Sequence, residues 1–225
     1  MKLARPDIRH PRIVLVGSES GDDAGLVAAL RKRGLHARWL SWDDPDTLRA
    51  DLVILRTVTR YADRLDEFLA WTQRVPNLLN APDVVAWNAG QHHLRDLRHA
   101  GVPVRSRGPT GAQTALVYLA GTQSHAFTSQ RPVDADFELW DLGQAALQAL
   151  VDQLGIGADE LLYARTDVVG APGHAELVGL DLVAPSLGWR LLDDAARDDG
   201  QRRFALCVES ALDRLGLGPL SQRRP

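Results

Sequence analysis

Three charged residues near the end of the chain have the types and spacing to handle a phosphorylated or metal-bound ligand. Residues 161–187 read LLYARTDVVGAPGHAELVGLDLVAPSL, which is typical of two alternating strands joined by a Gly/Pro turn at Gly170–Gly173. Period-2 alternation places Arg165 and Asp167 on one face of the first strand. If odd positions pair with odd positions, Asp181 joins them. Neighbouring carboxylates raise each other's pKa unless a cation compensates, and that cation could be Arg165 or a bound metal ion.

The YARTD strand, its turn and the acidic strand that ends in APSL resemble the C-terminal metal-binding hairpin of ATP-grasp ligases of the glutathione synthetase-like type. The resemblance implies that Arg165 would be the catalytic arginine that steadies an acyl-phosphate intermediate. It also implies that Asp167 and Asp181 would be metal ligands that hold Mg²⁺ against ATP. The family usually places a further Glu or Asn where this chain has Ala184, so one ligand is missing. The alternative is an ordinary hairpin with an Arg–Asp pair on its exposed face.

The composition is that of a globular protein with one large or two small domains. The chain has 225 residues, of which 45% are apolar and 24% are charged. The net charge of -3 argues against a nucleic-acid partner, and no basic cluster stands out except the short Arg223–Arg224 tail. No apolar run reaches the roughly 18 residues of a membrane span, and the N-terminus has no apolar signal segment. The single Cys207 fits a reducing compartment, so we expect a cytoplasmic protein with no membrane partner.

The first part of the chain predicts an open α/β unit with a parallel sheet. Three short apolar runs at 12–17, 35–42 and 51–57 are typical of buried parallel strands. In such a sheet, ligands gather at the carboxyl ends of the strands. Asn88 is predicted to cap a helix that runs to Ala100.

The second part predicts a smaller antiparallel α+β sheet domain. Residues 114–119 have the pattern of a strand, and the charged hairpin supplies two more. Apolar residues recur at helical spacing in 141–154 and in 201–215. The expected fold class is therefore α/β, with an N-terminal open parallel sheet followed by the smaller antiparallel sheet domain.

Both parts resemble regions of the same ligases, on the segments LVILRTVTRYADRLDEFLAW, LLNAPDVVAWNAGQHHLRDLRHAGVPV and TALVYLAGTQSHAFTS. The resemblance implies a pre-ATP-grasp-like domain at 1–104 and a C-terminal ATP-grasp-like remnant at 114–225. Residues 105–113 form a linker where a complete ligase has the small lobe that covers ATP and carries its phosphate-binding lysine. This chain has only Lys2 and Lys32, and neither lies near the required place. We therefore expect a truncated member that lacks the central nucleotide-binding lobe.

These losses predict a catalytically degenerate ATP-grasp-like protein that acts as a binding, scaffold or regulatory protein rather than as an active enzyme. The alternative is a residual ATP-dependent, ADP-forming carboxylate–amine ligase that a partner subunit completes. No cofactor is firmly expected: Mg²⁺ would bind at Asp167 and Asp181, and ATP only if a partner supplies the lobe. The expected partners are a second copy or another protein, because a lost lobe exposes apolar surface. A small carboxylate or amino-acid-like ligand is also expected.

Two further constellations have alternative interpretations. Ser124 and His125 could act as nucleophile and base, but adjacent residues on a strand point to opposite faces, so we expect no such pair. His92, Asp96 and His99 share one stripe of a predicted helix and could offer ligands to a metal. The same stripe equally suits a solvated helix surface.

Overall fold

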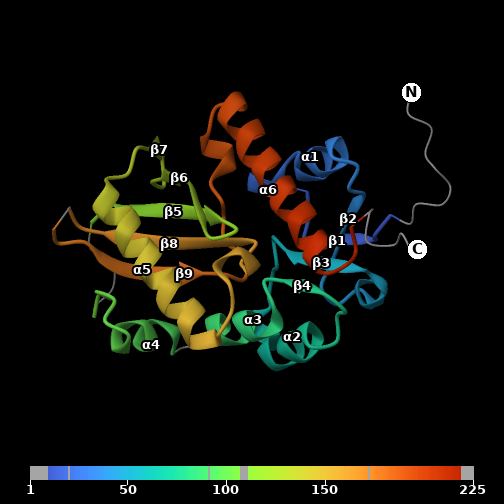
Figure 1. The fold of residues 1–225 in the computed structure, drawn as a ribbon, viewed down its shortest axis with the longest axis horizontal. Helices are drawn as coiled ribbons and strands as arrows, with labels where there is room; N and C mark the ends of the chain where they lie inside the picture. The colour runs from blue at the N-terminus through green and yellow to red at the C-terminus, as the bar shows by residue number, and fades with distance from the viewer. Residues whose placement is uncertain (1–9, 20, 91, 107–110, 172, 219–225) are drawn as a thin grey trace.

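Two β-sheets lie side by side (Figure 1). The computed structural model describes residues 10–19, 21–90, 92–106, 111–171 and 173–218. A parallel sheet has the order β2-β1-β3-β4, and an antiparallel sheet has the order β7-β6-β5-β8-β9. The predicted fold class is therefore confirmed.

The parallel sheet forms from the apolar runs of the first part. Its strands are β1 (Ile13–Val16), β2 (Ala37–Leu40), β3 (Leu52–Leu55) and β4 (Leu78–Leu79). The helices of this part are α1 (Leu26–Lys32), α2 (Leu65–Thr72), α3 (Pro82–Ala89) and α4 (His93–His99), with short 3₁₀ turns η1 (Gly21–Asp23), η2 (Pro45–Arg49) and η3 (Ala62–Arg64). β1 and β3 are buried along their whole length, as expected for continuous apolar strands inside a parallel sheet.

The antiparallel sheet carries one long helix on each side. Its strands are β5 (Gln113–Leu119), β6 (Thr122–Phe127), β7 (Pro132–Val133), β8 (Tyr163–Val169) and β9 (Glu176–Asp181). The helices are α5 (Phe137–Leu154) and α6 (Asp194–Arg214), with 3₁₀ turns η4 (Ala158–Glu160) and η5 (Trp189–Leu191). Both helices begin earlier than predicted, because Asp136 and Asp193 cap their first backbone N–H groups at 3.0 and 2.8 Å.

The helix predicted from Asn88 to Ala100 is wrong. The chain forms two helices there, and Pro82 begins the first of them, since proline is well suited to the first helical position. Asn88 lies inside α3 and is buried. Its amide donates to the carbonyl oxygen of Leu180 and accepts from the backbone N of Leu182, both at 2.8 Å. The side chain therefore joins the two parts of the chain instead of capping a helix.

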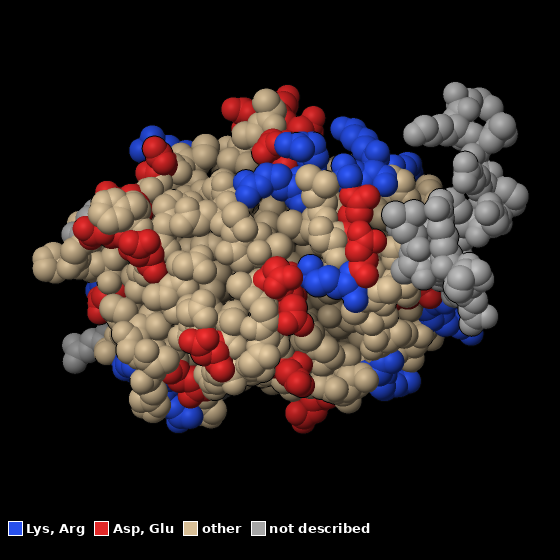
Figure 2. Space-filling model, viewed as in Figure 1, with Lys and Arg blue, Asp and Glu red and all other residues tan. Residues whose placement is uncertain are grey.

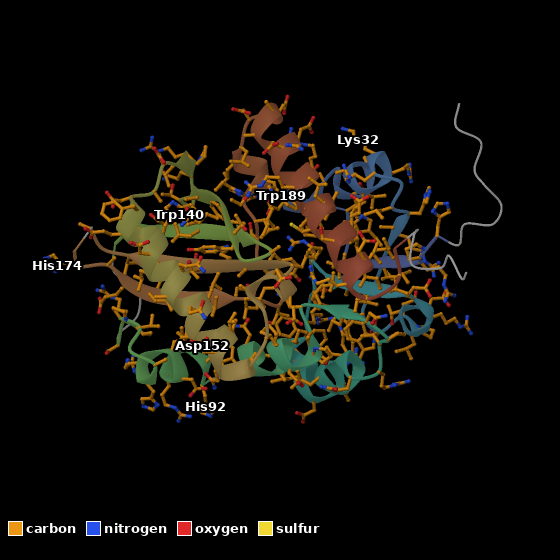
Figure 3. The ribbon with its side chains drawn as sticks, in the orientation of Figure 1. Lys32, His92, Trp140, Asp152, His174 and Trp189 are labelled. Atoms are coloured by element: carbon orange, nitrogen blue, oxygen red, sulfur yellow. The ribbon has the colours of Figure 1, made fainter. Side chains whose placement is uncertain are left out.

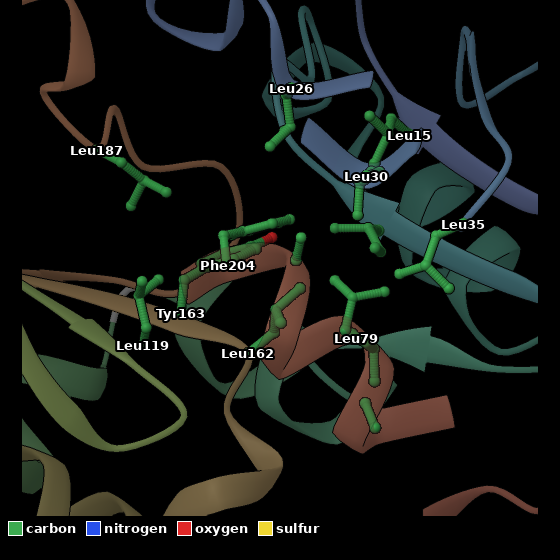
Figure 4. Packing of buried hydrophobic residues seen from close by; sticks show 14 of the residues in the cluster. Leu15, Leu26, Leu30, Leu35, Leu79, Leu119, Leu162, Tyr163, Leu187 and Phe204 are labelled. Carbon is green, nitrogen blue, oxygen red and sulfur yellow. The ribbon is translucent and has the colours of Figure 1, made fainter. Parts of the chain in front are cut away.

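The two sheets share one hydrophobic core, part of which is shown in Figure 4. Leu15 and Leu79 from the parallel sheet belong to the same buried cluster as Leu119 from the antiparallel sheet. Phe204 of α6 stacks on Tyr163 of β8, with ring centroids 6.4 Å apart. The division into domains at 1–104 and 114–225 stays an interpretation, and this common core ties the two parts together.

Buried polar side chains also fasten the two sheets to each other. The Asn80 amide donates to the carbonyl oxygens of Tyr163 at 3.0 Å and Leu182 at 2.8 Å, and it accepts from the backbone N of Leu162 at 2.8 Å. The buried Tyr163 hydroxyl bonds to the carbonyl oxygen of Leu55 on the parallel sheet. These bonds satisfy backbone groups that would be costly to bury unpaired.

Few large apolar side chains are exposed among the described residues: only Phe137, at 69%, and Leu215, at 41%. Figure 2 shows charged side chains of both signs along α6, whereas uncharged residues form most of the surface over α5 and the antiparallel sheet. The broad apolar surface expected from a lost lobe is not found on the part of the chain that the structure describes. The expectation of a second copy or protein partner therefore stays a prediction. No helix among the described residues is long and apolar enough to cross a membrane.

Candidate functional site

The candidate site lies where strand ends from both sheets meet. The loop after β1 carries Asp22 and Asp23, and Thr57 follows β3. Thr57 donates its hydroxyl to Asp23 at 2.8 Å, which joins these two loops. The segment after β9 reaches the same place, where the Ser186 hydroxyl donates to Asp22 at 3.1 Å.

Arg165, Asp167 and Asp181 share one face of the antiparallel sheet. The register pairs Arg165 with Asp181, and Asp167 lies two residues along the same strand. The Arg165 guanidinium donates from Nε at 2.9 Å and forms an ion pair from Nη2 at 2.8 Å, both with Oδ1 of Asp167. It also lies 5.3 Å above the Phe127 ring. Arg165 is thus held by its own strand neighbour and by an aromatic ring.

Both carboxylates of the predicted metal site already have partners. Asp181 turns toward its own chain, where its Oδ1 accepts from the backbone N of Val183 at 3.0 Å and of Ala184 at 3.2 Å. Asp167 is only 18% exposed, and burial raises its pKa while the charge of Arg165 opposes that rise. Burial, and secondarily the charge of Asp181, raises the pKa of the Tyr61 phenol.

The donor set does not fit a magnesium site. Mg²⁺ takes several oxygen ligands in near-octahedral geometry, and Ala184 offers no side-chain oxygen where the family has Glu or Asn. No cluster of three or more His, Cys, Asp or Glu side chains that could hold a metal occurs among the described residues. This finding covers the stripe of His92, Asp96 and His99 as well. The roles assigned to Arg165, Asp167 and Asp181 stay predictions.

Residues 183–191 cover the face that carries Arg165. Arg165 Nη1 donates to the Ser186 carbonyl oxygen at 3.4 Å. Asp22 fastens the segment from the other sheet, accepting from the backbone N of Gly188 at 2.9 Å and of Arg190 at 3.0 Å. Gly188 has a φ of 69°, and an added Cβ there would lie 2.4 Å from the Phe127 ring, so the segment packs directly on the sheet.

A buried ion pair lies beneath this segment. Arg56 donates from Nε to Asp23 Oδ1 at 2.9 Å and from Nη2 to the Pro185 carbonyl oxygen at 3.0 Å. Its guanidinium also lies 5.0 Å from the Tyr163 ring centroid and 5.7 Å from that of Trp189. No role for Arg56 was predicted from the sequence. Its signal was a single arginine at the end of the otherwise apolar run DLVIL.

The expectation that Ser124 and His125 point apart is wrong. The register between β5 and β6 shifts between Val117 and Tyr118, so β6 does not alternate regularly there. Ser124 Oγ lies 3.0 Å from Nδ1 of His125, and His125 Nε2 lies 2.6 Å from the Leu187 carbonyl oxygen. A carbonyl oxygen only accepts, so Nε2 carries the proton. Burial lowers the pKa of His125, which favours this neutral form.

No lysine approaches Arg165 among the described residues. Figure 3 shows Lys32 extending from α1 into solvent on the outer side of the molecule, and Lys2 lies outside the described residues. The two acids that follow Gly21, Asp22 and Asp23, fasten other backbone and side-chain groups instead of leaving this turn open to a phosphate. Among the described residues, the cation on this face is therefore Arg165 and not a lysine.

Comparisons of sequence place the first third of the chain. A family model described as the N-terminal domain of the D-cycloserine synthetase DcsG matches residues 9–80. The cycloserine biosynthesis protein DcsG of Streptomyces lavendulae is 34% identical over 84 residues, which are 35% of this chain and 28% of that protein. The chain thus matches little more than a quarter of the length of this curated relative.

Comparisons of structure extend over nearly the whole chain. The crystal structure of D-cycloserine synthetase DcsG matches with a TM-score of 0.75 and 22% identity, covering 89% of this chain and 99% of that one. D-alanine–D-alanine ligase from Bacillus anthracis, complexed with ATP, matches with a TM-score of 0.63 and 12% identity over 91% and 98%. The ATP-grasp ligase PsnB, complexed with a precursor variant, Mg and ADP, matches with a TM-score of 0.59 and 14% identity over 91% and 99%. These likenesses show a common fold.

Proposed function

We propose that the chain, which shares its fold with ATP-grasp ligases and its N-terminal sequence with DcsG, is a catalytically degenerate member of these ligases that acts as a binding, scaffold or regulatory protein. The observation that carries the proposal is that Arg165 is paired with Asp167 and bonded to the Ser186 carbonyl oxygen, so that its side chain is only 24% exposed. Phosphoryl transfer relies on positioned cations and excluded water around the phosphates. A face already occupied by the protein's own chain offers little room for either.

The short connection between the sheets supports a missing lobe. Only residues 105–112 separate Val104, which forms an isolated bridge with Leu177, from β5. The curated DcsG is longer than this chain, because the same 84 residues make up 35% of this chain and 28% of DcsG. The alignment with the DcsG crystal structure nevertheless covers 99% of that chain. Additional residues of a longer relative would then lie inside the alignment, as a lobe inserted at this linker would.

The charges of the site support the same proposal. Asp167 neutralises the charge of Arg165, and Asp181 accepts hydrogen bonds from the backbone of the turn that follows it. A residual catalyst would need these groups released toward a nucleotide and a metal ion. Each electrostatic contact with a developing transition-state charge is typically worth about 3 kcal/mol, so their loss leaves little rate acceleration.

A small carboxylate or amino-acid-like ligand remains the proposed cargo of the strand-end loops. Arg60 follows β3, is exposed and adopts a φ of 59°, a strained conformation for a residue with a side chain. Such strain clusters at binding loops. Arg60 forms no ion pair with any residue that the structure describes, so its guanidinium is free to receive a carboxylate.

The alternative is a ligase that a partner subunit completes, and one assay separates the two functions. ADP release from Mg-ATP is measured for the purified chain and for Arg165→Met, with and without proteins that co-purify with it. We expect no ADP release that depends on Arg165. Release by the wild type that Arg165→Met abolishes would contradict degeneracy, and release only in the presence of a co-purified protein would favour the alternative.

A further inference from the structure

A cavity rich in arginine lies at the opposite edge of the parallel sheet from the candidate site. It has a volume of about 520 Å³ and opens beside the first residues of β1 and β2. Parallel strands place all their N-terminal ends on one edge, whereas the loops that carry Asp22 and Thr57 follow the carboxyl ends. The cavity is therefore separate from the Arg165 face. Its volume lies within the range of about 300 to 1,000 Å³ that small-molecule sites occupy.

Four guanidinium groups, from three elements and the segment before β1, surround this space, which we call the arginine cleft. Arg12 precedes β1, Arg31 lies in the last turn of α1, Arg38 lies on β2, and Arg49 ends η2. These positions are separated in the sequence by up to 37 residues, so the sequence pattern does not indicate that they meet. The fold brings the four side chains together around the cavity.

Two carboxylates balance only part of this charge. Asp51 accepts from Arg12 Nε at 3.2 Å, and Asp46 is shared by Arg38 at 3.1 Å and Arg49 at 3.0 Å. Arg31 forms no ion pair with the residues that the structure describes. Among the described residues around the cleft, four guanidinium groups are thus paired with only two carboxylates. Like charges held together without a counter-charge repel, and an anion relieves that repulsion.

We propose that the arginine cleft binds a small organic anion that carries two or more phosphate or carboxylate groups. A guanidinium group presents a planar fork of donors that matches either group with two parallel hydrogen bonds. The floor of the cleft includes Ile13 and Val14 of the buried strand β1, and the four arginines lie around it. His36, which also lines the cleft, contacts His10 edge-on at 5.5 Å and supplies a further polar wall.

Calorimetric titration of the full chain with inorganic pyrophosphate and, separately, with citrate tests this proposal. We expect saturable binding of at least one probe, and which probe binds tells whether phosphate or carboxylate is preferred. Arg31→Glu reverses the charge of an exposed arginine without an ion pair, so the variant should fold and should weaken binding about tenfold. Arg49→Ala is a second variant with the same expected direction. Raising the salt from about 0.05 to 0.3 M should weaken binding further, because the arginines are exposed.

The matched control is Arg131→Glu, an exposed arginine on the antiparallel sheet. It makes the same change in net charge far from the cleft, and we expect it to bind the probe like the wild type. If neither probe binds saturably at concentrations up to about 10 mM, the proposal is overturned. Any dissociation constant would then lie above about 10 mM, which is too weak for a specific site. Equal weakening by Arg31→Glu and Arg131→Glu would also overturn it, because the effect would then be one of net charge.

Discussion

Asp22 holds Gly188: its carboxylate accepts a 2.9 Å hydrogen bond from the Gly188 backbone N and so ties the loop after the first strand to the segment that covers Arg165. The same carboxylate accepts from Ser186 and Arg190, so one side chain holds three groups of residues 183–191. Residues 183–191 are therefore held beside Arg165 by a side chain from the first part of the chain.

Replacing Asp22 by alanine should loosen this segment. The backbone N–H groups of Gly188 and Arg190 lose their acceptor, and we expect them to exchange with deuterium faster than in the wild type. The free energy of unfolding should fall by about 1 to 3 kcal/mol, as for a lost charged acceptor. Glu19→Ala, an exposed acid in the same loop, is the control and should leave the exchange unchanged. Unchanged exchange in Asp22→Ala would show that packing alone holds the segment.

The buried pair of Arg56 and Asp23 gives a second expectation. Arg56→Met leaves Asp23 buried without its cation, and the free energy of unfolding in urea should fall by about 3 to 5 kcal/mol. The double variant Arg56→Met/Asp23→Leu should recover part of that loss, because no buried charge remains. Arg38→Met, which removes an exposed ion pair, should cost about 1 kcal/mol or less. A double variant no more stable than Arg56→Met would contradict this account of the pair.

The buried hydrogen bonds of Asn80 between the two sheets should contribute more to the free energy of unfolding than the single bond of Asn77. Asn80→Ala removes three buried hydrogen bonds and leaves the backbone groups of Leu162 and Leu182 unpaired. We expect a loss of about 2 to 5 kcal/mol in the free energy of unfolding. Asn77→Ala removes one bond, to the Asp51 carbonyl oxygen at 2.9 Å, and is the matched control with a loss of about 1 kcal/mol. Equal losses in the two variants would be inconsistent with a junction fastened by Asn80.

His125 should make stability depend on pH. Burial, its largest influence, lowers its pKa; Arg203 acts in the same direction, and the Leu187 carbonyl and Asp22 oppose them. The unfolded chain then takes up a proton at higher pH than the folded chain, so stability is present above about pH 6.5 and is lost as the pH falls below it. Urea unfolding between about pH 8 and 5 should show a shallower loss in His125→Gln, whose amide can still donate to Leu187. If the free energy of unfolding depends on pH equally in the wild type and in His125→Gln, His125 is not the group that titrates.

Much of the architecture could be predicted from the sequence. The apolar runs around β1 and β3 and the alternation of β8 and β9 set their class, because each pattern suits a strand with a given burial. Helix starts were less accurate, since Asp136 and Asp193 cap α5 and α6 upstream of the apolar stripes. The helix assigned to Asn88 was wrong, because its amide pairs with β9, which lies far away in the sequence.

The candidate site could be predicted only in part. Alternation placed Arg165, Asp167 and Asp181 on one face, as the register shows. It could not show that Asp181 would bond to the turn that follows it, because a side chain's partner depends on how the strand ends. The Ser124 and His125 contact depends on a local register shift, and the arginine cleft depends on residues from three elements and the segment before β1. Contacts of this kind come from the tertiary fold and leave no local signal.

Calorimetry with Mg-ATP tests the central claim most directly. The titration uses the isolated Arg31→Glu chain, so that binding in the arginine cleft is weakened, and is repeated with Arg165→Met added. The account predicts no saturable heat at nucleotide concentrations up to about 5 mM in either protein. Saturable binding of Mg-ATP that disappears with Arg165→Met would contradict it, because the Arg165 face would then hold a nucleotide without help.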